Sequence, residues 1–388
     1  MRKLLSFVVI VGSAVTLFAA CQSKLSHLER AEQMRANIYK LYDVDRTALL
    51  SENYPLNTPD QVTYLANGLP EFPNQYSFLW PYSGTLSMMS ALYEANGLED
   101  CLKFIDNNVL VGLDMYFDKS RQPYGYSSYI TVAKSDRFYD DNIWLAIDFT
   151  DLYKLTNDKK YLDRALQTWE FVMSGYDEKL DGGIYWCEQT KESKNACSNA
   201  PAAVCALKLY EATGDAKYLE LATSLYDWTV KWLYDERSGL FSDNVNIENQ
   251  KVARAKYSYN TGQMIQAAAK LHLITKEPRY LEQAQAYAEA SFKRWFKEHD
   301  GGVILESGDI WFDAVLLRGL IELYQIDGNA KYIDAVDHTL SYAWENGRDE
   351  QGLFGKFLSH QEEGKPKRWL LNQAAYAEMS ARMAIVKR

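Results

Sequence analysis

A unit of helix, short polar turn and helix recurs along the chain, and this internal repeat constrains the fold more than any other feature. Apolar residues recur at helical spacing on both sides of each polar turn, so each copy predicts a helical hairpin. A degenerate copy occupies residues 92–105. In four further copies a tyrosine begins the second helix, with spacings of 57, 62 and 52 residues: Tyr161, Tyr218, Tyr280 and Tyr332.

Six hairpins are expected in all. The helix predicted near 26–42 can pair with the one near 370–386 to complete the sixth. A unit of about 50–60 residues is longer than tetratricopeptide or armadillo repeats, and six copies favour a closed ring over an open solenoid. The sequence therefore predicts an all-α fold, an (α/α)6 toroid of six helical hairpins with inner and outer helices.

The starts of the predicted inner helices define the expected site. Inner helices that run parallel bring their N-termini, with free N–H groups and positive dipole ends, to one mouth of the ring. The adjacent acids Asp140 and Asp141 lie at one such start. Around them we expect eight further residues to reach substrate: Tyr82, Tyr139, Trp186, Asn199, Tyr259, Asn260, Trp311 and Asp313.

Polar residues at helix starts cap helices more often than they bind ligands. Asp140 and Asp141 go beyond that role, because one acid suffices for a cap. Asn199 follows Asp140 by 59 residues and Asn260 follows Asn199 by 61, which we interpret as equivalent positions of the repeat. Pro201 is interpreted as the first residue of its helix.

The N-terminus carries a predicted export signal. Arg2 and Lys3 precede an apolar run, and two alanines precede Cys21, which resembles a bacterial lipobox. We expect residues 1–20 to be removed, Cys21 to be acylated, and residues 21–388 to form one toroid domain in the cell envelope. An ordinary secretory signal is the alternative. The residues after Cys21 lack the acidic cluster that resembles a surface-export tag, which favours the periplasmic face.

The formal net charge of −10 makes nucleic acid and anionic membrane surfaces poor partners. We expect a monomer that meets the membrane only through the lipid on Cys21. Five histidines and the absence of a CxxC pair predict neither a metal site nor a cofactor. A bridge between Cys187 and Cys197 is left open.

Several sequence blocks together resemble glycoside hydrolase family 76, with similarity from about Trp80 to Tyr376. This resemblance implies a toroid that hydrolyses α-1,6-mannosidic bonds of mannan with retention of configuration. It also implies that Asp140 is the nucleophile and Asp141 the general acid/base. Two departures concern the subsites: Leu79-Trp80-Pro81 lacks the paired tryptophans of the first hairpin, and Cys197 replaces an aliphatic residue. The blocks are FYDDN (138–142), GGIYW (182–186), KN and NAPAA (194–203), and YNTGQ (259–263).

A retaining glycosidase needs two carboxyl groups about 5–5.5 Å apart. Adjacent side chains diverge within a strand or helix, but a bend into a helix start can aim both into one cavity. Two close carboxylates cannot both ionise easily, so we expect one raised pKa. The 28 Tyr and 10 Trp offer faces for stacking on sugars, although we assign four tryptophans within helical patterns to packing: Trp144, Trp169, Trp228 and Trp295.

Two alternatives remain open. Another toroid enzyme, such as an unsaturated uronyl hydrolase or a sugar epimerase, would need basic residues or histidines near the acids, and Arg254 is the only obvious candidate. A non-catalytic glycan-binding lipoprotein would not need the intact pair of Asp140 and Asp141. Hydrolysis of linear α-1,6-mannan separates the enzyme from the binding protein.

Overall fold

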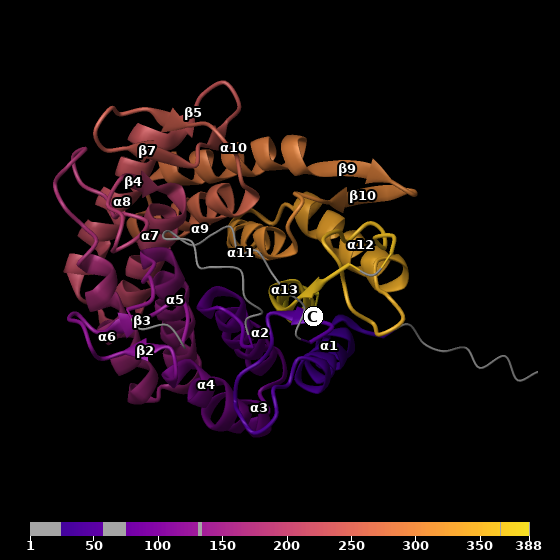
Figure 1. The fold of residues 1–388 in the computed structure, drawn as a ribbon. Coiled ribbons are helices and arrows are strands. Elements are labelled where there is room, and N and C mark those ends of the chain that lie inside the picture. The colour runs from indigo at the N-terminus through magenta and orange to yellow at the C-terminus, as the bar shows by residue number, and fades with distance from the viewer. Residues whose placement is uncertain (1–24, 57–74, 131–133, 365, 388) are drawn as a thin grey trace, which may run out of the picture.

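Two concentric rings of helices build the structure, a computed structural model that describes residues 25–56, 75–130, 134–364 and 366–387 (Figure 1). The predicted toroid is confirmed. The expected signal peptide and Cys21 lie outside the described residues. The inner helices are α2 (Leu79–Asn96), α5 (Tyr139–Thr156), α7 (Ala196–Thr213), α9 (Ser258–Thr275), α11 (Ile310–Asp327) and α13 (Leu370–Val386).

Each inner helix except α13 leads through a short turn into an outer helix, as the repeat predicts, and α13 pairs with α1 from the other end of the chain. The outer helix that follows α2 is broken: α3 (Glu99–Phe104) passes through a π-helical segment, Ile105–Val109, into α4 (Leu110–Asp114). The remaining outer helices are α1 (His27–Leu41), α6 (Lys159–Met173), α8 (Ala216–Leu233), α10 (Pro278–Trp295) and α12 (Lys331–Asn346).

Burial follows the sequence pattern of each ring. The inner helices are apolar or small around most of their circumference, so residues 196–209 of α7 and 258–271 of α9 are buried without a break. The outer helices are amphipathic and bury one face, which is the pattern of helices with one side in water. Neighbouring α9 and α11 approach closely at Gly262, where a Cβ would lie 2.5 Å from Cα of Leu316.

The ring closes between the two ends of the chain. Helix α13 contacts both α2 and α11 in the inner ring, and α1 packs on α13, which confirms the predicted sixth hairpin. Strand β1 (Asn53–Tyr54) pairs with β11 (Arg368–Trp369) across the same seam. A buried ion pair joins Arg318 of α11 to Glu378 of α13, with distances of 2.7 and 2.8 Å.

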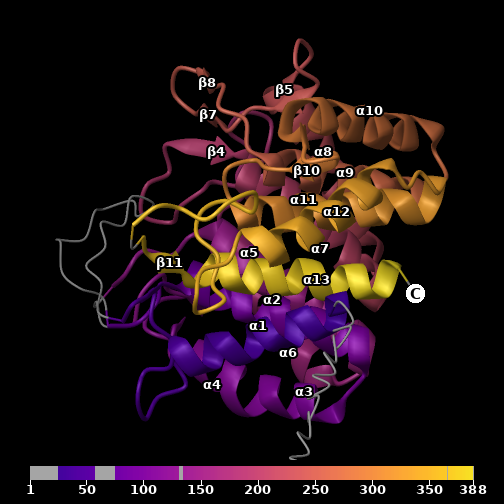
Figure 2. The same cartoon turned by 90° about the vertical axis from the view of Figure 1, so that its right-hand side faces the viewer.

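Short antiparallel strands lie in several of the connections between helices. Figure 2 shows β4, β7, β8 and β11 at one end of the inner helices, with the described C-terminus at the other end. The hairpins are β2 (Phe117–Asp118) with β3 (Gly125–Tyr126), β5 (Tyr234–Asp235) with β6 (Leu240–Phe241), and β9 (Phe296–His299) with β10 (Gly302–Leu305). A three-stranded sheet has the order β4 (Ser193–Asn195), β7 (Asn244–Asn246) and β8 (Val252–Ala253).

The inner helices are capped differently from the prediction. Only Asp309 caps an inner helix through its side chain, accepting hydrogen bonds from the first turn of α11. At the starts of α2, α5, α7 and α13 a carbonyl from another segment accepts from the first N–H of the helix, as Trp186 does for Tyr139 at 2.9 Å. The assignment of Pro201 as a first helical residue is wrong, because pairing of β4 with β7 lets α7 begin at Ala196.

Candidate active site

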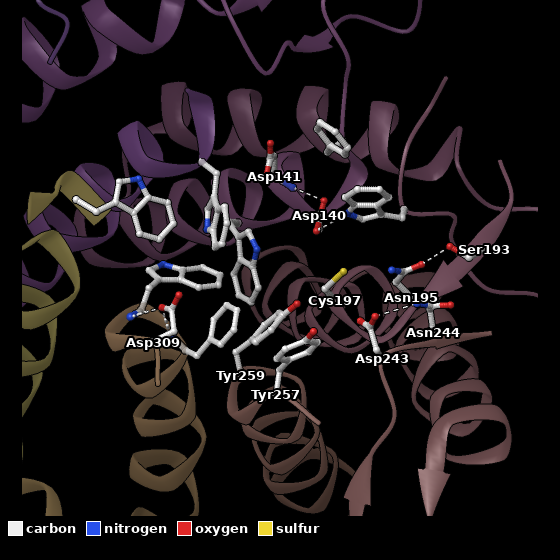
Figure 3. A pocket seen from close by; sticks show the side chains of 17 residues that line it. Asp140, Asp141, Ser193, Asn195, Cys197, Asp243, Asn244, Tyr257, Tyr259 and Asp309 are labelled. Carbon is white, nitrogen blue, oxygen red and sulfur yellow. Dashed lines mark hydrogen bonds between the residues drawn. The ribbon is translucent and has the colours of Figure 1, made fainter. Parts of the chain in front are cut away.

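A cavity of about 660 Å³ opens where the inner helices begin (Figure 3). Both predicted catalytic acids lie in its wall, in the first turn of α5. Of the ten predicted site residues, Asp140, Asp141, Trp186, Tyr259 and Trp311 line the cavity. Twelve further residues complete the lining: Trp80, Phe138, Trp144, Ser193, Asn195, Cys197, Asp243, Asn244, Tyr257, Asp309, Phe312 and Trp369.

The structure does not bring the other five predicted residues to the cavity. Tyr82 is buried between helices, and its hydroxyl donates to the carbonyl of Ala48 at 2.7 Å. Tyr139 points outward from α5 and stacks on Phe171, with ring centroids 5.1 Å apart. Asn260 is fully buried, and its side-chain amide has no hydrogen-bond partner among the described residues.

Asn199 and Asp313, the last two, are buried in the first turns of their helices. The Asn199 side chain holds a loop, accepting from the N–H of Ile184 at 2.7 Å and donating to the carbonyl of the same residue at 2.9 Å. Burial raises the pKa of Asp313 to about 8, against the neighbouring Ser307, which lowers it. Two more inner-helix amides make the same two-way hydrogen bond: Asn142 with Tyr126, and Gln373 with Phe354.

Asn199→Ala is expected to lower the free energy of unfolding by about 1–3 kcal/mol, because it leaves the buried N–H and carbonyl of Ile184 without partners. Urea unfolding measures this loss. Gln373→Ala removes the same kind of contact far from the acids and should cost a similar amount. A variant of Asn199 that keeps its stability but binds mannan oligosaccharides more weakly would instead indicate a substrate contact.

The register of the repeat explains which residues reach the cavity. The fourth residues of α5, α7, α9 and α11 show the tyrosine spacings of 57, 62 and 52: Asn142, Asn199, Thr261 and Asp313. Asn199 is therefore equivalent to Asn142, not to Asp140. The second residues of the same helices all line the cavity: Asp140, Cys197, Tyr259 and Trp311. Cys197 follows Asp140 by 57 residues, the spacing from Tyr161 to Tyr218, so the tyrosine spacing could have identified Cys197 as a site residue.

Backbone pairing sets the position of Asp140. Phe138, just before α5, forms an antiparallel bridge with Cys187. That pairing places the Trp186 indole beside the acid, where its Nε1–H donates to Oδ2 of Asp140 at 3.2 Å. The N–H of Asp141 donates to the other carboxyl oxygen of Asp140 at 3.1 Å. One carboxyl group is thus fixed by its own helix and by the neighbouring loop.

Charged and glycine residues outside the cavity hold the loop that carries Trp186. Arg137 is fully buried, and its Nε donates to Oε2 of Glu188 at 2.8 Å. Gly183 turns this loop with a φ of +87°, and a Cβ there would lie 2.7 Å from the ring of Trp228. Glycine is the residue that adopts this conformation without strain. The GGIYW block therefore shapes the loop, and only its last residue lines the cavity.

The two acids differ in their surroundings. Burial raises the pKa of Asp140 to about 6, while the nearby Cys197 thiol and the hydrogen bonds from the Asp141 N–H and the Trp186 indole lower it. Burial and the charge of Asp140 together raise the pKa of Asp141 well above its usual range. The Asp141 carboxyl accepts no hydrogen bond from the described residues. The two carboxyl groups therefore titrate as a coupled pair, in which the surroundings of Asp140 favour its ionised form more than those of Asp141.

Aromatic side chains form the opposite wall of the cavity. The ring of Trp311 meets Trp80 and Trp144 edge to face, with centroids 5.2 and 5.1 Å apart. Tyr259 stacks on Phe312 at 4.3 Å. The prediction that Trp144 only packs between helices is wrong, because Trp144 lies one turn after the acids on α5 and lines the cavity. Such faces suit the C–H surfaces of sugar rings.

The polar part of the lining is acidic. Four aspartates face the cavity, and its described lining contains no Lys, Arg or His. Arg254 is exposed and does not line it. An anionic uronyl substrate would lack a partner there, whereas a neutral sugar finds carboxylate and amide groups for its hydroxyls. The lining aspartates are Asp140, Asp141, Asp243 and Asp309.

The described residues were also searched for membrane-spanning helices, metal-binding clusters and paired cysteines. None of their helices is long and apolar enough to cross a membrane. They contain no group of three or more His, Cys, Asp or Glu residues arranged to hold a metal ion. Cys187 and Cys197, for which a bridge was left open, are separate buried thiols in the structure.

Comparison with known proteins gives a consistent picture. Residues 26–309, well over half of the chain, match the sequence model of glycosyl hydrolase family 76. A family 76 mannosidase structure from Bacteroides thetaiotaomicron aligns with a TM-score of 0.84 and 31% identity, over 93% of this chain and 99% of the other. An α-1,6-mannanase from Salegentibacter sp. aligns with a TM-score of 0.76 and 27% identity, over 93% and 100% of the two chains.

Ligand complexes and a fungal relative extend the comparison. Inactive variants of the Salegentibacter enzyme, each with two adjacent aspartates replaced, have been solved with α-1,6-mannotriose and α-1,6-mannotetrose. The mannan endo-1,6-alpha-mannosidase of Candida albicans is 25% identical over 249 residues, 58% of this chain and 54% of its own. The chain spans about half the length of the curated relatives it matches. On the evidence of the family match and of the toroid with its acidic mouth, this chain belongs to glycosyl hydrolase family 76.

Proposed function

We propose that the protein hydrolyses α-1,6-mannosidic bonds in mannan or manno-oligosaccharides with retention of configuration. The observation that carries the proposal is the cavity itself, in which two adjacent carboxyl groups share a lining with several tryptophans and no Lys, Arg or His comes from the described residues. The α-1,6-mannanase and its oligosaccharide complexes among the relatives support the choice of linkage.

In the proposed reaction Asp140 attacks the anomeric carbon while Asp141 protonates the departing glycosidic oxygen. The pKa order fits these roles, because the acid that ionises first is the nucleophile and the acid that keeps its proton is the donor. Water then cleaves the mannosyl-Asp140 ester, with Asp141 now acting as base. Trp186 keeps the attacking carboxylate in place throughout.

The direct test is incubation of the purified protein with linear α-1,6-mannan and measurement of new reducing ends. The stereochemistry of the first product, followed by NMR before mutarotation, reports retention or inversion. Starch and α-1,2-mannan serve as linkage controls. A protein that binds α-1,6-mannan without releasing reducing ends would support the alternative of a non-catalytic glycan-binding protein and overturn this proposal.

The pH dependence of kcat/KM should be bell-shaped, with its acidic limb near pH 6. Below this limb Asp140, whose pKa burial raises to about 6, is protonated and cannot attack. The alkaline limb reports loss of the proton from Asp141, whose pKa is raised well above the usual range by burial and by Asp140. Full activity maintained down to pH 4 would show that the Asp140 carboxyl has an ordinary pKa.

A further inference from the structure

Glu52 joins the seam of the ring to the aromatic wall of the cavity. It is 2% exposed and directly precedes β1. Its Oε1 accepts from the Nε1–H of the Trp369 indole at 2.7 Å, and its Oε2 accepts from the N–H of Phe78 at 2.8 Å. Its main-chain carbonyl accepts from the N–H of Leu370 at 3.0 Å. One buried residue thus holds the starts of α2 and α13 together and binds the edge of a tryptophan that lines the cavity.

Trp369 forms an aromatic pair with Trp80. The two rings meet edge to face, with centroids 5.2 Å apart and planes at 85°, and Trp80 in turn meets Trp311 at 5.2 Å. Trp80 and Trp369 both line the cavity and are partly exposed, so each can also contact a ligand. An indole face suits the C–H surface of a sugar ring, and the hydrogen bond at its N–H edge keeps that face in one orientation.

This aromatic pair lies away from the acids. In the inner ring α2 stands between α5, which carries the acids, and α13, which Trp369 directly precedes. The tryptophan that contacts the acids is a different one, Trp186, through its bond to Asp140. The cavity of about 660 Å³ is larger than a single sugar ring requires. A manno-oligosaccharide cleaved at Asp140 therefore reaches Trp369 with another of its sugars.

We propose that Trp369, with Trp80, forms a sugar-binding subsite at least one mannosyl unit from the bond that is cleaved, and that Glu52 is its positioning residue. This inference rests on the proposed function. The two carboxyl oxygens of Glu52 accept from two N–H donors at once, so the indole is held in place before substrate arrives. A side chain that is already ordered costs less conformational entropy when it binds a ligand.

The first test measures kcat and KM on α-1,6-manno-oligosaccharides from the dimer to the hexamer. Glu52→Leu removes both accepting oxygens. It should lower kcat/KM for the hexamer about 3- to 10-fold further than for the shortest oligosaccharide that is cleaved, through KM and not kcat, because the weakened contact is remote from the reacting bond. Glu52→Gln keeps one accepting oxygen and should lose less. The control is Trp295→Phe, a buried tryptophan outside the cavity, which should leave the dependence on length unchanged.

A second variant tests the same contact without touching the bond between Glu52 and Phe78. Trp369→Phe keeps an aromatic ring but removes the N–H, and it should show the same length-dependent loss. Adding Glu52→Leu to it should increase this loss little, because the two residues act through one hydrogen bond. Losses that are equal at every length, or that multiply in the double variant, would reduce Glu52 to a residue of the seam and overturn the inference.

A binding measurement separates this inference from the proposed function. Calorimetric titration of α-1,6-mannohexaose into Asp140→Ala, with and without Trp369→Ala, needs no turnover. Trp369→Ala should weaken the affinity about 3- to 10-fold, and an unchanged affinity would overturn the subsite. A wild type that does not cleave mannan, together with hexamer binding that still depends on Trp369, would overturn the proposed function and leave the subsite in place.

Discussion

Asp140→Ala should reduce kcat/KM for α-1,6-mannan by at least about 10³-fold, with helical content and unfolding midpoint close to wild type. The expected loss is large because Asp140 is the carboxylate that the cavity holds ready, through hydrogen bonds from Trp186 and from the N–H of Asp141. Asp141 cannot replace it as nucleophile, because in this proposal its proton is needed at the leaving oxygen. The measurement is release of reducing ends by each purified variant, with Glu220→Gln on an exposed face of α8 as the control.

The two acids can be assigned separately with Asp141→Ala and azide. On mannan this variant should lose about 10²–10⁴-fold, the usual contribution of a general acid. On an aryl α-1,6-mannobioside with an acidic phenol it should lose much less at the glycosylation step, because that leaving group needs no proton.

Azide then reports the role of each missing carboxylate through the product it forms. With Asp141→Ala, azide enters the place of the base and should give an α-mannosyl azide. With Asp140→Ala, azide takes the place of the nucleophile and should give the β-mannosyl azide. The opposite pattern of products would exchange the roles of the two residues, and inverted hydrolysis products from wild type would rule out the double-displacement mechanism.

The sequence predicted the ring but misplaced part of its inner wall. Four tyrosines at spacings of 57, 62 and 52 residues were enough to predict stacked hairpins, because each hairpin must bury its apolar face against its neighbours. Matching Asn199 to Asp140 by chemical similarity shifted the register by two residues. On a helix a shift of two turns a side chain by about 200°. Asn199 accordingly faces the loop at Ile184, while Cys197 faces the cavity.

Other parts of the site depend on contacts that no local pattern encodes. Asn195 and Asn244 reach the cavity because β4 pairs with β7, two short segments about fifty residues apart in sequence. Asp243 precedes that pairing and accepts the first N–H of α7 through its carbonyl, at 2.7 Å. Such loops have neither helical periodicity nor a cap signature. The helix starts could therefore be read from the sequence, whereas the polar wall between them could not.

Glu378→Gln is expected to lower the free energy of unfolding by about 3–5 kcal/mol, the usual cost of breaking a buried ion pair from one side. Glu378 is 1% exposed and binds Arg318 through two hydrogen bonds and Arg382 through one of 2.7 Å. The substitution leaves two guanidinium groups without their shared counter-ion, with Asp148 as the remaining acid facing Arg318. The affected contact joins α11 to α13, where the ring closes.

The expected pH dependence separates this ion pair from simple packing. Burial alone would raise the pKa of Glu378, but the charges and hydrogen bonds of Arg318 and Arg382 outweigh it and lower the pKa to about 2. The stabilisation is therefore complete above pH of about 4.5 and declines as the pH falls towards 2, so wild type and Glu378→Gln should converge in acid. Urea unfolding at pH 7 and at pH 3.5 measures this. The half-exposed pair of Lys331 and Glu289 is the control, and its removal should cost less than about 1 kcal/mol. An equal loss for Glu378→Gln at both pH values would mean that shape, not charge, closes the ring at this seam.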